Sequence, residues 1–159
     1  MPSSNASSGH AGVQAMWSRD SSGRPLVLVI DDVGPMARRL ARLLKRSGLR
    51  VETCTSSLGA LERIGSGARF DVVVCEVAMQ SLDGVGFYVR ASAAWPEIRH
   101  RMVFVSGGLP EEAKEFIQRE CLPFFAKPLD RQTREDLVAI VRGLAIAGVL
   151  RSRGTGHAR

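Results

Sequence analysis

The sequence predicts an α/β protein in which helices cover both faces of a doubly wound, parallel, five-stranded sheet. Short, continuously apolar runs rich in β-branched residues recur along the chain, and such runs are typical of strands buried on both faces. Between them lie segments with apolar residues at helical spacing, so that strand and helix alternate five times. In sheets of this kind, ligands bind at the carboxyl ends of the strands, which is where we look for functional residues.

The first two strand–helix units are marked by proline and glycine. Residues 26–30 are wholly apolar and predict the first strand. The following helix begins near Pro35, which suits a first helical turn, and ends at Gly48. Residues 49–54 alternate in polarity and predict a second strand, and residues 56–64 predict a short helix that ends at a glycine.

The rest of the chain repeats this alternation. The third helix stops before Pro96, because proline disfavours a helical conformation of the residue that precedes it. The last helix carries an apolar stripe at helical spacing. The expected elements are strands at 70–75, 101–105 and 122–126, and helices at 83–94, 110–119 and 130–150.

Length and composition predict one domain with loose ends. We expect a disordered leader over 1–24, a domain over 25–150 and a basic flexible tail over 151–159. Much of the net charge of +6 lies near the two ends, which argues against nucleic-acid binding. No apolar run approaches the ~20 residues that span a membrane. The three cysteines lack CxxC spacing, which favours reduced thiols in the cytoplasm over a disulfide framework.

Five polar residues follow the strands at the edge where chemistry is expected: Asp31, Asp32, Glu76, Ser106 and Lys127. Three carboxylates this close repel one another, which favours a bound hard cation such as Mg²⁺ or Mn²⁺. An ammonium and a hydroxyl beside them suit the stabilisation of a transferring phosphoryl group. Each residue alone is commonly a turn, cap or loop residue, so the prediction depends on all five together.

The segments 29–32, 71–84, 104–107 and 124–128 resemble the receiver domain of two-component response regulators. The resemblance covers about residues 25–147 and consists of four motifs in the family's order. It implies a flavodoxin-like fold with strand order 2-1-3-4-5. It also implies a Mg²⁺-dependent phosphoacceptor site that receives its phosphoryl group from a phosphohistidine partner.

The resemblance assigns a role to each matching position. The metal contacts would be the acid pair Asp31 and Asp32, the backbone carbonyl of Ala78, and Glu76 as a further carboxylate. Ser106 would be the switch hydroxyl, Lys127 the lysine that pairs with the phosphoryl group, and Phe124 the aromatic residue that turns inward with the switch.

Glu76 departs from the family, because it stands where the family has the phosphorylated aspartate. Its extra methylene adds about 1.5 Å of reach, and a misplacement of about 1 Å can slow an in-line reaction on the order of 10²-fold. We therefore expect a phosphorylation-independent module that is a partial mimic of the phosphorylated state or fixed in one state, and no enzyme beyond residual phosphoacceptor activity. Two alternatives are a weakly phosphorylated, Mg²⁺-dependent receiver and a docking scaffold whose site is a relic.

Partners are expected to be proteins. Because the sequence ends soon after the last helix, we expect output through a histidine kinase, a phosphotransfer protein or a downstream effector. The last helix is apolar on more than one face, with Ile140, Ile146 and Leu150 among its residues, which indicates either a long core helix or a homodimer contact. The basic first helix indicates either a solvated face or a surface for an acidic partner helix.

Overall fold

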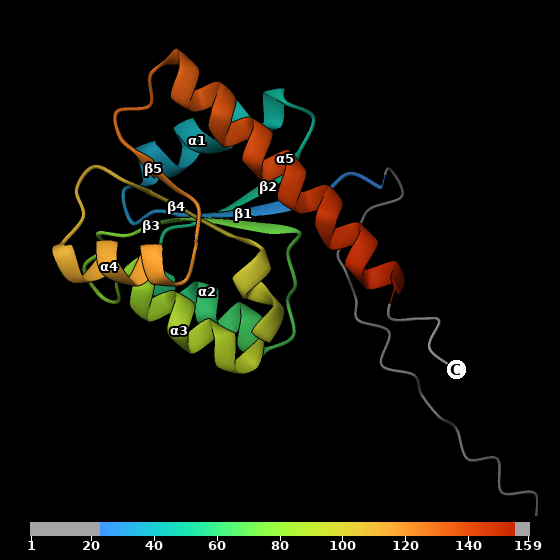
Figure 1. Cartoon of the computed structure of the whole chain (residues 1–159), viewed down its shortest axis with the longest axis horizontal. Helices are drawn as coiled ribbons and strands as arrows, with labels where there is room; N and C mark the ends of the chain where they lie inside the picture. Colours follow the sequence, from blue (N-terminus) through green and yellow to red (C-terminus); the bar gives the residue numbers. More distant parts are fainter. Residues whose placement is uncertain (1–22, 155–159) are drawn as a thin grey trace, which may run out of the picture.

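The computed structural model describes residues 23–154 of the chain, which form a five-stranded sheet between helices (Figure 1). The expected leader, apart from Gly23 and Arg24, and residues 155–159 lie outside the described residues. In chain order the elements are β1 (Leu26–Ile30), α1 (Gly34–Arg46), β2 (Arg50–Cys54), α2 (Ser57–Gly65), β3 (Val72–Glu76), α3 (Gly84–Ala94), the 3₁₀ helix η1 (Pro96–His100), β4 (Met102–Ser106), α4 (Glu111–Arg119), β5 (Phe124–Ala126) and α5 (Arg131–Gly154).

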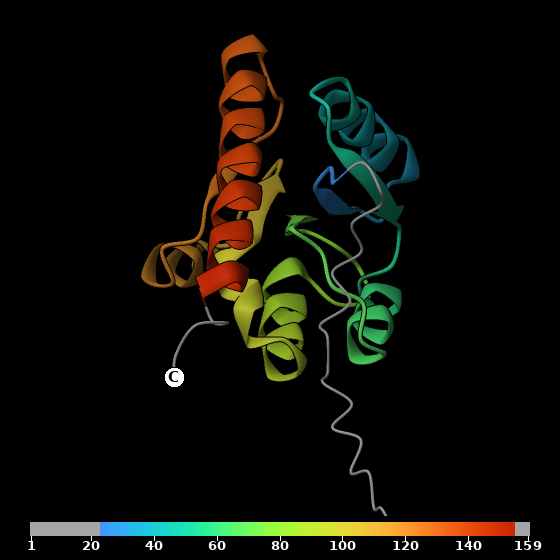
Figure 2. The same cartoon turned by 90° about the vertical axis from the view of Figure 1, so that its right-hand side faces the viewer.

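The sheet is parallel throughout, with strand order β2-β1-β3-β4-β5. Helices α1 and α5 cover one face, and α2, α3 and α4 cover the other (Figures 1 and 2). This arrangement confirms the predicted flavodoxin-like fold. It also brings the carboxyl ends of β1, β3, β4 and β5 to one edge of the sheet.

The central strands β1, β3 and β4 are buried at every residue, which explains their continuously apolar sequences. Their side chains alternate between two cores. In β1, Val27 and Val29 pack beneath α1 and α5, whereas Leu28 and Ile30 pack beneath α2, α3 and α4. Both faces of the sheet therefore need a helical cover.

Most elements begin and end within two residues of the sequence-based expectation; the larger differences are one additional helix and a longer α5. The 3₁₀ helix η1 was not expected. Its residue Ile98 and the preceding Trp95 are buried in the core beneath α2, α3 and α4 and hold η1 against it. Helix α5 continues to Gly154 instead of ending at Leu150, because residues 151–153 contain no helix breaker. Across residues 23–154, no helix combines the length and the apolar character needed to cross a membrane.

Candidate functional site

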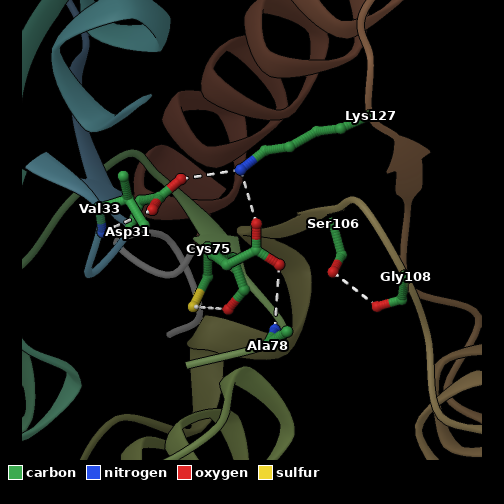
Figure 3. A network of polar contacts seen from close by, with 8 residues as sticks. Asp31, Val33, Cys75, Ala78, Ser106, Gly108 and Lys127 are labelled. Atoms are coloured by element: carbon green, nitrogen blue, oxygen red, sulfur yellow. Dashed lines mark hydrogen bonds and ion pairs between the residues drawn. The ribbon is translucent and has the colours of Figure 1, made fainter. Parts of the chain in front are cut away.

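The strand register brings the predicted site residues to a common level. Ile30 at the end of β1 pairs with Cys75 of β3, and Ser106 at the end of β4 pairs with Ala126 of β5. Asp31 and Lys127 are the next residues after β1 and β5, and Glu76 is the last residue of β3. Figure 3 shows the side chains of Asp31 and Lys127 directed toward one another across this edge.

Lys127 bridges two buried carboxylates. Its Nζ lies 2.8 Å from Asp31 Oδ2 and 2.6 Å from Glu76 Oε2. The side chains of Asp31 and Glu76 are only 4% and 9% exposed. Burial alone would lower the pKa of Lys127, but the hydrogen bonds and charges of the two carboxylates outweigh it and raise that pKa above its ordinary value. The lysine is therefore held as a cation between two anions.

The remaining oxygens of these two carboxylates are also occupied. The backbone N–H of Ala78 donates to Glu76 Oε1 at 3.0 Å, and the N–H of Val33 donates to Asp31 Oδ1 at 2.9 Å. Each carboxylate therefore has one oxygen on the lysine and the other on a backbone amide. Together the contacts fix the orientation of both side chains.

Asp32 and Ser106 lie outside this bridge. Asp32 is exposed, and its Oδ2 accepts a hydrogen bond of 3.1 Å from the backbone N–H of Gln80 in the β3–α3 loop. The hydroxyl of Ser106 is buried and donates to the carbonyl oxygen of Gly108 at 2.8 Å (Figure 3). The side chain of Glu76 thus reaches Lys127, whereas the hydroxyl of Ser106 forms its hydrogen bond within the loop that follows β4.

The start of α3 holds the loop after Glu76 close to the sheet. The carboxylate of Asp83 caps the helix by accepting a hydrogen bond of 2.6 Å from the N–H of Gly86. A Cβ at Gly84 would overlap the carbonyl oxygen of Glu76, so only glycine permits this approach. The Asp-Gly pair thus fixes where β3 ends and, with it, the position of Glu76.

An aromatic cluster lies between β4 and α4. Tyr88 of α3 packs edge to face against Phe104 of β4 and Phe116 of α4, with ring centroids 6.4 and 5.8 Å apart. Phe124 of β5 is half-buried and packs against the same core. The sequence did not single out Tyr88, because an aromatic residue on an apolar helix face indicates burial and nothing more specific.

The donors expected for Mg²⁺ are of the right chemical kind, since hard cations prefer carboxylate oxygens. In the arrangement described, the ammonium of Lys127 already supplies a positive charge to both Asp31 and Glu76. Within residues 23–154, no group of three or more acidic, histidine or cysteine side chains is placed to hold a metal ion. Magnesium therefore stays a prediction from the sequence.

A basic groove borders the site between α1 and the start of α5. The groove has a volume of 380 Å³, and Asp31 and Lys127 are among the residues that line it. Apolar and basic side chains share its walls. The residues of this α1–α5 groove are Met36, Leu40, Leu43, Pro128 and Leu129 on the apolar side and Arg39, Arg42, Arg46 and Arg134 on the basic side.

Comparison with known proteins agrees with this architecture. The family model of the response regulator receiver domain matches residues 27–142. The chain is 31% identical over 104 residues to the transcriptional regulatory protein ZraR of Escherichia coli K12, covering 65% of this chain and 23% of that protein. It is 36% identical over 72 residues to the protein-glutamate methylesterase/protein-glutamine glutaminase 1 of Anaeromyxobacter dehalogenans, covering 45% of this chain and 20% of that protein. The chain thus spans about a fifth of the length of these curated relatives.

Solved structures show the same fold. A CheY-like response regulator receiver domain protein from Methanospirillum hungatei superposes with a TM-score of 0.69 at 16% identity, covering 80% of this chain and 98% of that one. An uncharacterized protein from Neptuniibacter caesariensis superposes with a TM-score of 0.71 at 27% identity, covering 85% and 97%.

Proposed function

This chain belongs to the response regulator receiver domain family, and from that premise we propose that it is a signalling module whose state does not depend on phosphorylation. The observation that carries the proposal is the ion pair of 2.6 Å between Glu76 and Lys127. Glu76 stands at the position where the family has the phosphorylated aspartate. Its carboxylate already holds the lysine that would pair with the phosphoryl group.

The contacts of Glu76 argue against its acting as a nucleophile. In-line attack needs a carboxylate oxygen held roughly 3–3.5 Å from phosphorus with its lone pair aligned. One oxygen of Glu76 is bound to the ammonium of Lys127 and the other to the amide of Ala78. These hydrogen bonds withdraw charge from both oxygens and so lower their nucleophilicity, in a site where the side chain is 9% exposed. We therefore assign Glu76 a structural role in setting the state of the module.

That state combines a feature of the phosphorylated form of a receiver with a feature of the unphosphorylated form. The lysine is engaged by a carboxylate, as it would be by a phosphoryl oxygen, whereas the hydroxyl of Ser106 is engaged by Gly108. A carboxylate carries one charge and two oxygens, but a phosphoryl group carries more charge and three acceptor oxygens. Glu76 thus satisfies the lysine without recruiting the hydroxyl, and we infer a module fixed in this one state.

We further propose that the module acts through protein contacts, with a histidine kinase, a phosphotransfer protein or an effector as the partner class. The α1–α5 groove is the surface that fits such a partner. None of the basic side chains on the exposed face of α1 pairs with an acidic residue within residues 23–154; we call this set, Arg38, Arg39, Arg42, Lys45 and Arg46, the basic face of α1. Beside an apolar wall, these charges suit an amphipathic helix with acidic residues. The cytoplasm is the compartment we propose, in keeping with the free thiols of Cys54, Cys75 and Cys121.

The test is the intact mass of the protein after incubation with a small-molecule phosphodonor, with and without Mg²⁺. Wild type, Glu76→Asp and Glu76→Gln are compared. We expect phosphate on Glu76→Asp alone, because the shorter carboxylate restores the family's acceptor geometry and the glutamine removes the nucleophile.

Other outcomes separate the alternatives. Phosphate on the wild type but not on Glu76→Gln would contradict the proposal and identify a working, unusual acceptor. Absence of phosphate from all three proteins would favour the docking scaffold with a relic site. A melting curve of each variant checks that the substitutions leave the fold intact.

A further inference from the structure

A second groove lies between α4 and the loop that leads from β3 into α3. It has a volume of 660 Å³, and it lies on the face of the sheet opposite to α1 (Figures 1 and 2). We call it the α3–α4 groove. Its apolar lining comes from the loop, from the first turn of α3 and from one side of α4, and includes Val77, Met79, Val85, Ala113 and Phe116.

The charged side chains that line the α3–α4 groove are mostly acidic. Glu112 and Glu115 are exposed on α4, and neither forms an ion pair with a basic side chain within residues 23–154. Asp83 adds a third carboxylate at the start of α3. The guanidinium of Arg119 is partly balanced by the carboxylate of Glu120, which lies 3.7 Å away. The groove therefore carries a net negative charge, opposite in sign to the basic face of α1.

The α3–α4 groove suits a segment of protein chain better than an enclosed small molecule. Its charged residues are all exposed, so that it is open to solvent along its polar side. The strand that leads into it, β3, pairs with β1 on one side and β4 on the other, and offers no free edge to an extended peptide. Recognition must then come from side chains, which is how an amphipathic helix docks in a groove.

We infer that the α3–α4 groove binds an amphipathic helix of another protein, and that the polar face of this helix is basic. The apolar face of the helix would cover Val85, Ala113 and Phe116, which are half-buried in the domain. Lysine or arginine residues along its sides would pair with Glu112 and Glu115. Apolar burial supplies the affinity, and the charges select the partner and orient it.

The two grooves should therefore select different partners. The α1–α5 groove suits a helix with acidic residues, whereas the α3–α4 groove repels such a helix and attracts a basic one. Because the grooves lie on opposite faces of the sheet, the two partners do not compete for the same residues. The inference does not depend on whether Glu76 accepts phosphate or on what binds the α1–α5 groove.

A pair of peptides tests the inference on the full chain. The first is a fluorescein-labelled peptide of about 18 residues with leucine at helical spacing on one face and lysine on the other. The second has glutamate in place of every lysine. Fluorescence anisotropy measures affinity, and amide chemical shifts of the isotope-labelled protein locate the contact. We expect the lysine peptide to shift amides along α4 and over residues 77–85, and the glutamate peptide to leave them unchanged.

Two double variants on α4 separate the charges of the groove from the charge of the helix. Glu112→Gln with Glu115→Gln removes two carboxylates that line the groove, and should weaken binding of the lysine peptide about threefold to tenfold. Glu111→Gln with Glu120→Gln is the matched control. It changes the net charge equally at two exposed positions outside the groove, and should leave the affinity within about twofold of the wild type.

A substitution within the groove tests the apolar contact. Ala113→Lys should weaken binding at least about tenfold, because it fills the groove with a long side chain whose charge repels the peptide. Gln118→Lys is its control, since Gln118 is exposed on the same helix and does not line the groove. The amide spectrum of each variant without peptide shows that the fold is intact.

Several results would overturn the inference. These are no binding of the lysine peptide up to about 1 mM, equal binding of both peptides at the groove, or equal weakening by the two double variants. Shifts of the same amides when the protein alone is concentrated would identify a second copy as the occupant and would also overturn it. Shifts along α1 with the glutamate peptide report on the α1–α5 groove, so that the two proposals succeed or fail separately.

Discussion

Gly148 of α5 lies directly against the guanidinium of Arg101, so that a Cβ at position 148 would overlap Nη1. Arg101 is 2% exposed, donates to the carbonyl oxygen of Asp71 at 3.3 Å and lies over the ring of Trp95. The last turns of α5 are therefore packed against a buried arginine at the edge of the sheet. This contact explains why the helix stays attached to the domain so close to its end.

Gly148→Ala should destabilise the domain by about 1–3 kcal/mol, because the added methyl group forces α5 or Arg101 to move. Gly143→Ala is the matched control on the same helix. It should stabilise the domain by roughly 0.5–1 kcal/mol, since alanine is the better helix former and position 143 has free space around it. Urea unfolding followed by circular dichroism measures both. A Gly148→Ala variant as stable as Gly143→Ala would show that the contact with Arg101 is not constraining.

Replacing Lys127 by methionine should destabilise the domain on the order of 3 kcal/mol, because it leaves two buried carboxylates without a cation. The double variant Lys127→Met with Glu76→Gln should lose less than the sum of the single changes, with a coupling on the order of 1–2 kcal/mol. Urea unfolding of the four proteins in this cycle gives the coupling directly. Simple additivity would mean that the 2.6 Å contact contributes nothing to folding.

The three thiols should react with a disulfide reagent in the order of their exposure. Cys121 is exposed, Cys54 is half-buried and Cys75 is buried. Burial first, and then the adjacent carboxylate of Glu76, raise the pKa of the Cys75 thiol well above its ordinary value. We expect Cys121 to react fastest and Cys75 only when the protein unfolds. Rapid labelling of Cys75 in the folded protein, identified by peptide mass, would contradict this order.

Asp130 caps α5 and should make the stability of the domain sensitive to acid. The backbone N–H of Thr133 donates to its carboxylate at 2.8 Å, and this hydrogen bond lowers the pKa of Asp130 below its ordinary value of 3.8. Its contribution is therefore fully present above 3.8 and is lost as the pH falls through the lowered pKa of the folded state.

Asp130→Asn is the variant that isolates this effect, because asparagine caps a helix without titrating. The wild type should exceed the variant in stability near neutral pH, and the difference should shrink as the pH falls below 3.8. Thermal melts from pH 7 to pH 2 measure the difference. A constant difference over that range would show that the carboxylate charge at Asp130 is not involved.

The fold could be predicted from the sequence because its signals are local and repeat. The apolar strand at 26–30 and the proline that begins α1 mark the same kind of unit that recurs down the chain. The ends of elements have weaker sequence signals: the continuation of α5 to Gly154 depends on the absence of a helix-breaking residue. The 3₁₀ helix after Trp95 depends on tertiary burial and has no local pattern of its own.

The site was predictable as a set of residues but not as a set of contacts. Because parallel strands end at one edge of the sheet, Asp31, Glu76 and Lys127 lie close together. The hydrogen-bond partner of each polar group depends on interatomic distances, which a sequence pattern does not specify. The bond from Ser106 to Gly108 is one such case.

The basic face of α1 also affects the rate at which an acidic partner binds. These charges pair with no acidic side chain within residues 23–154, and their field extends about 10 Å into a solution of 0.1 M salt, where it attracts an acidic partner before contact. The association rate with that partner should therefore fall steeply as ionic strength rises, while the dissociation rate changes little. For the partner proposed above, the charges of α1 should set the association rate, and the apolar wall of the α1–α5 groove should set the dissociation rate.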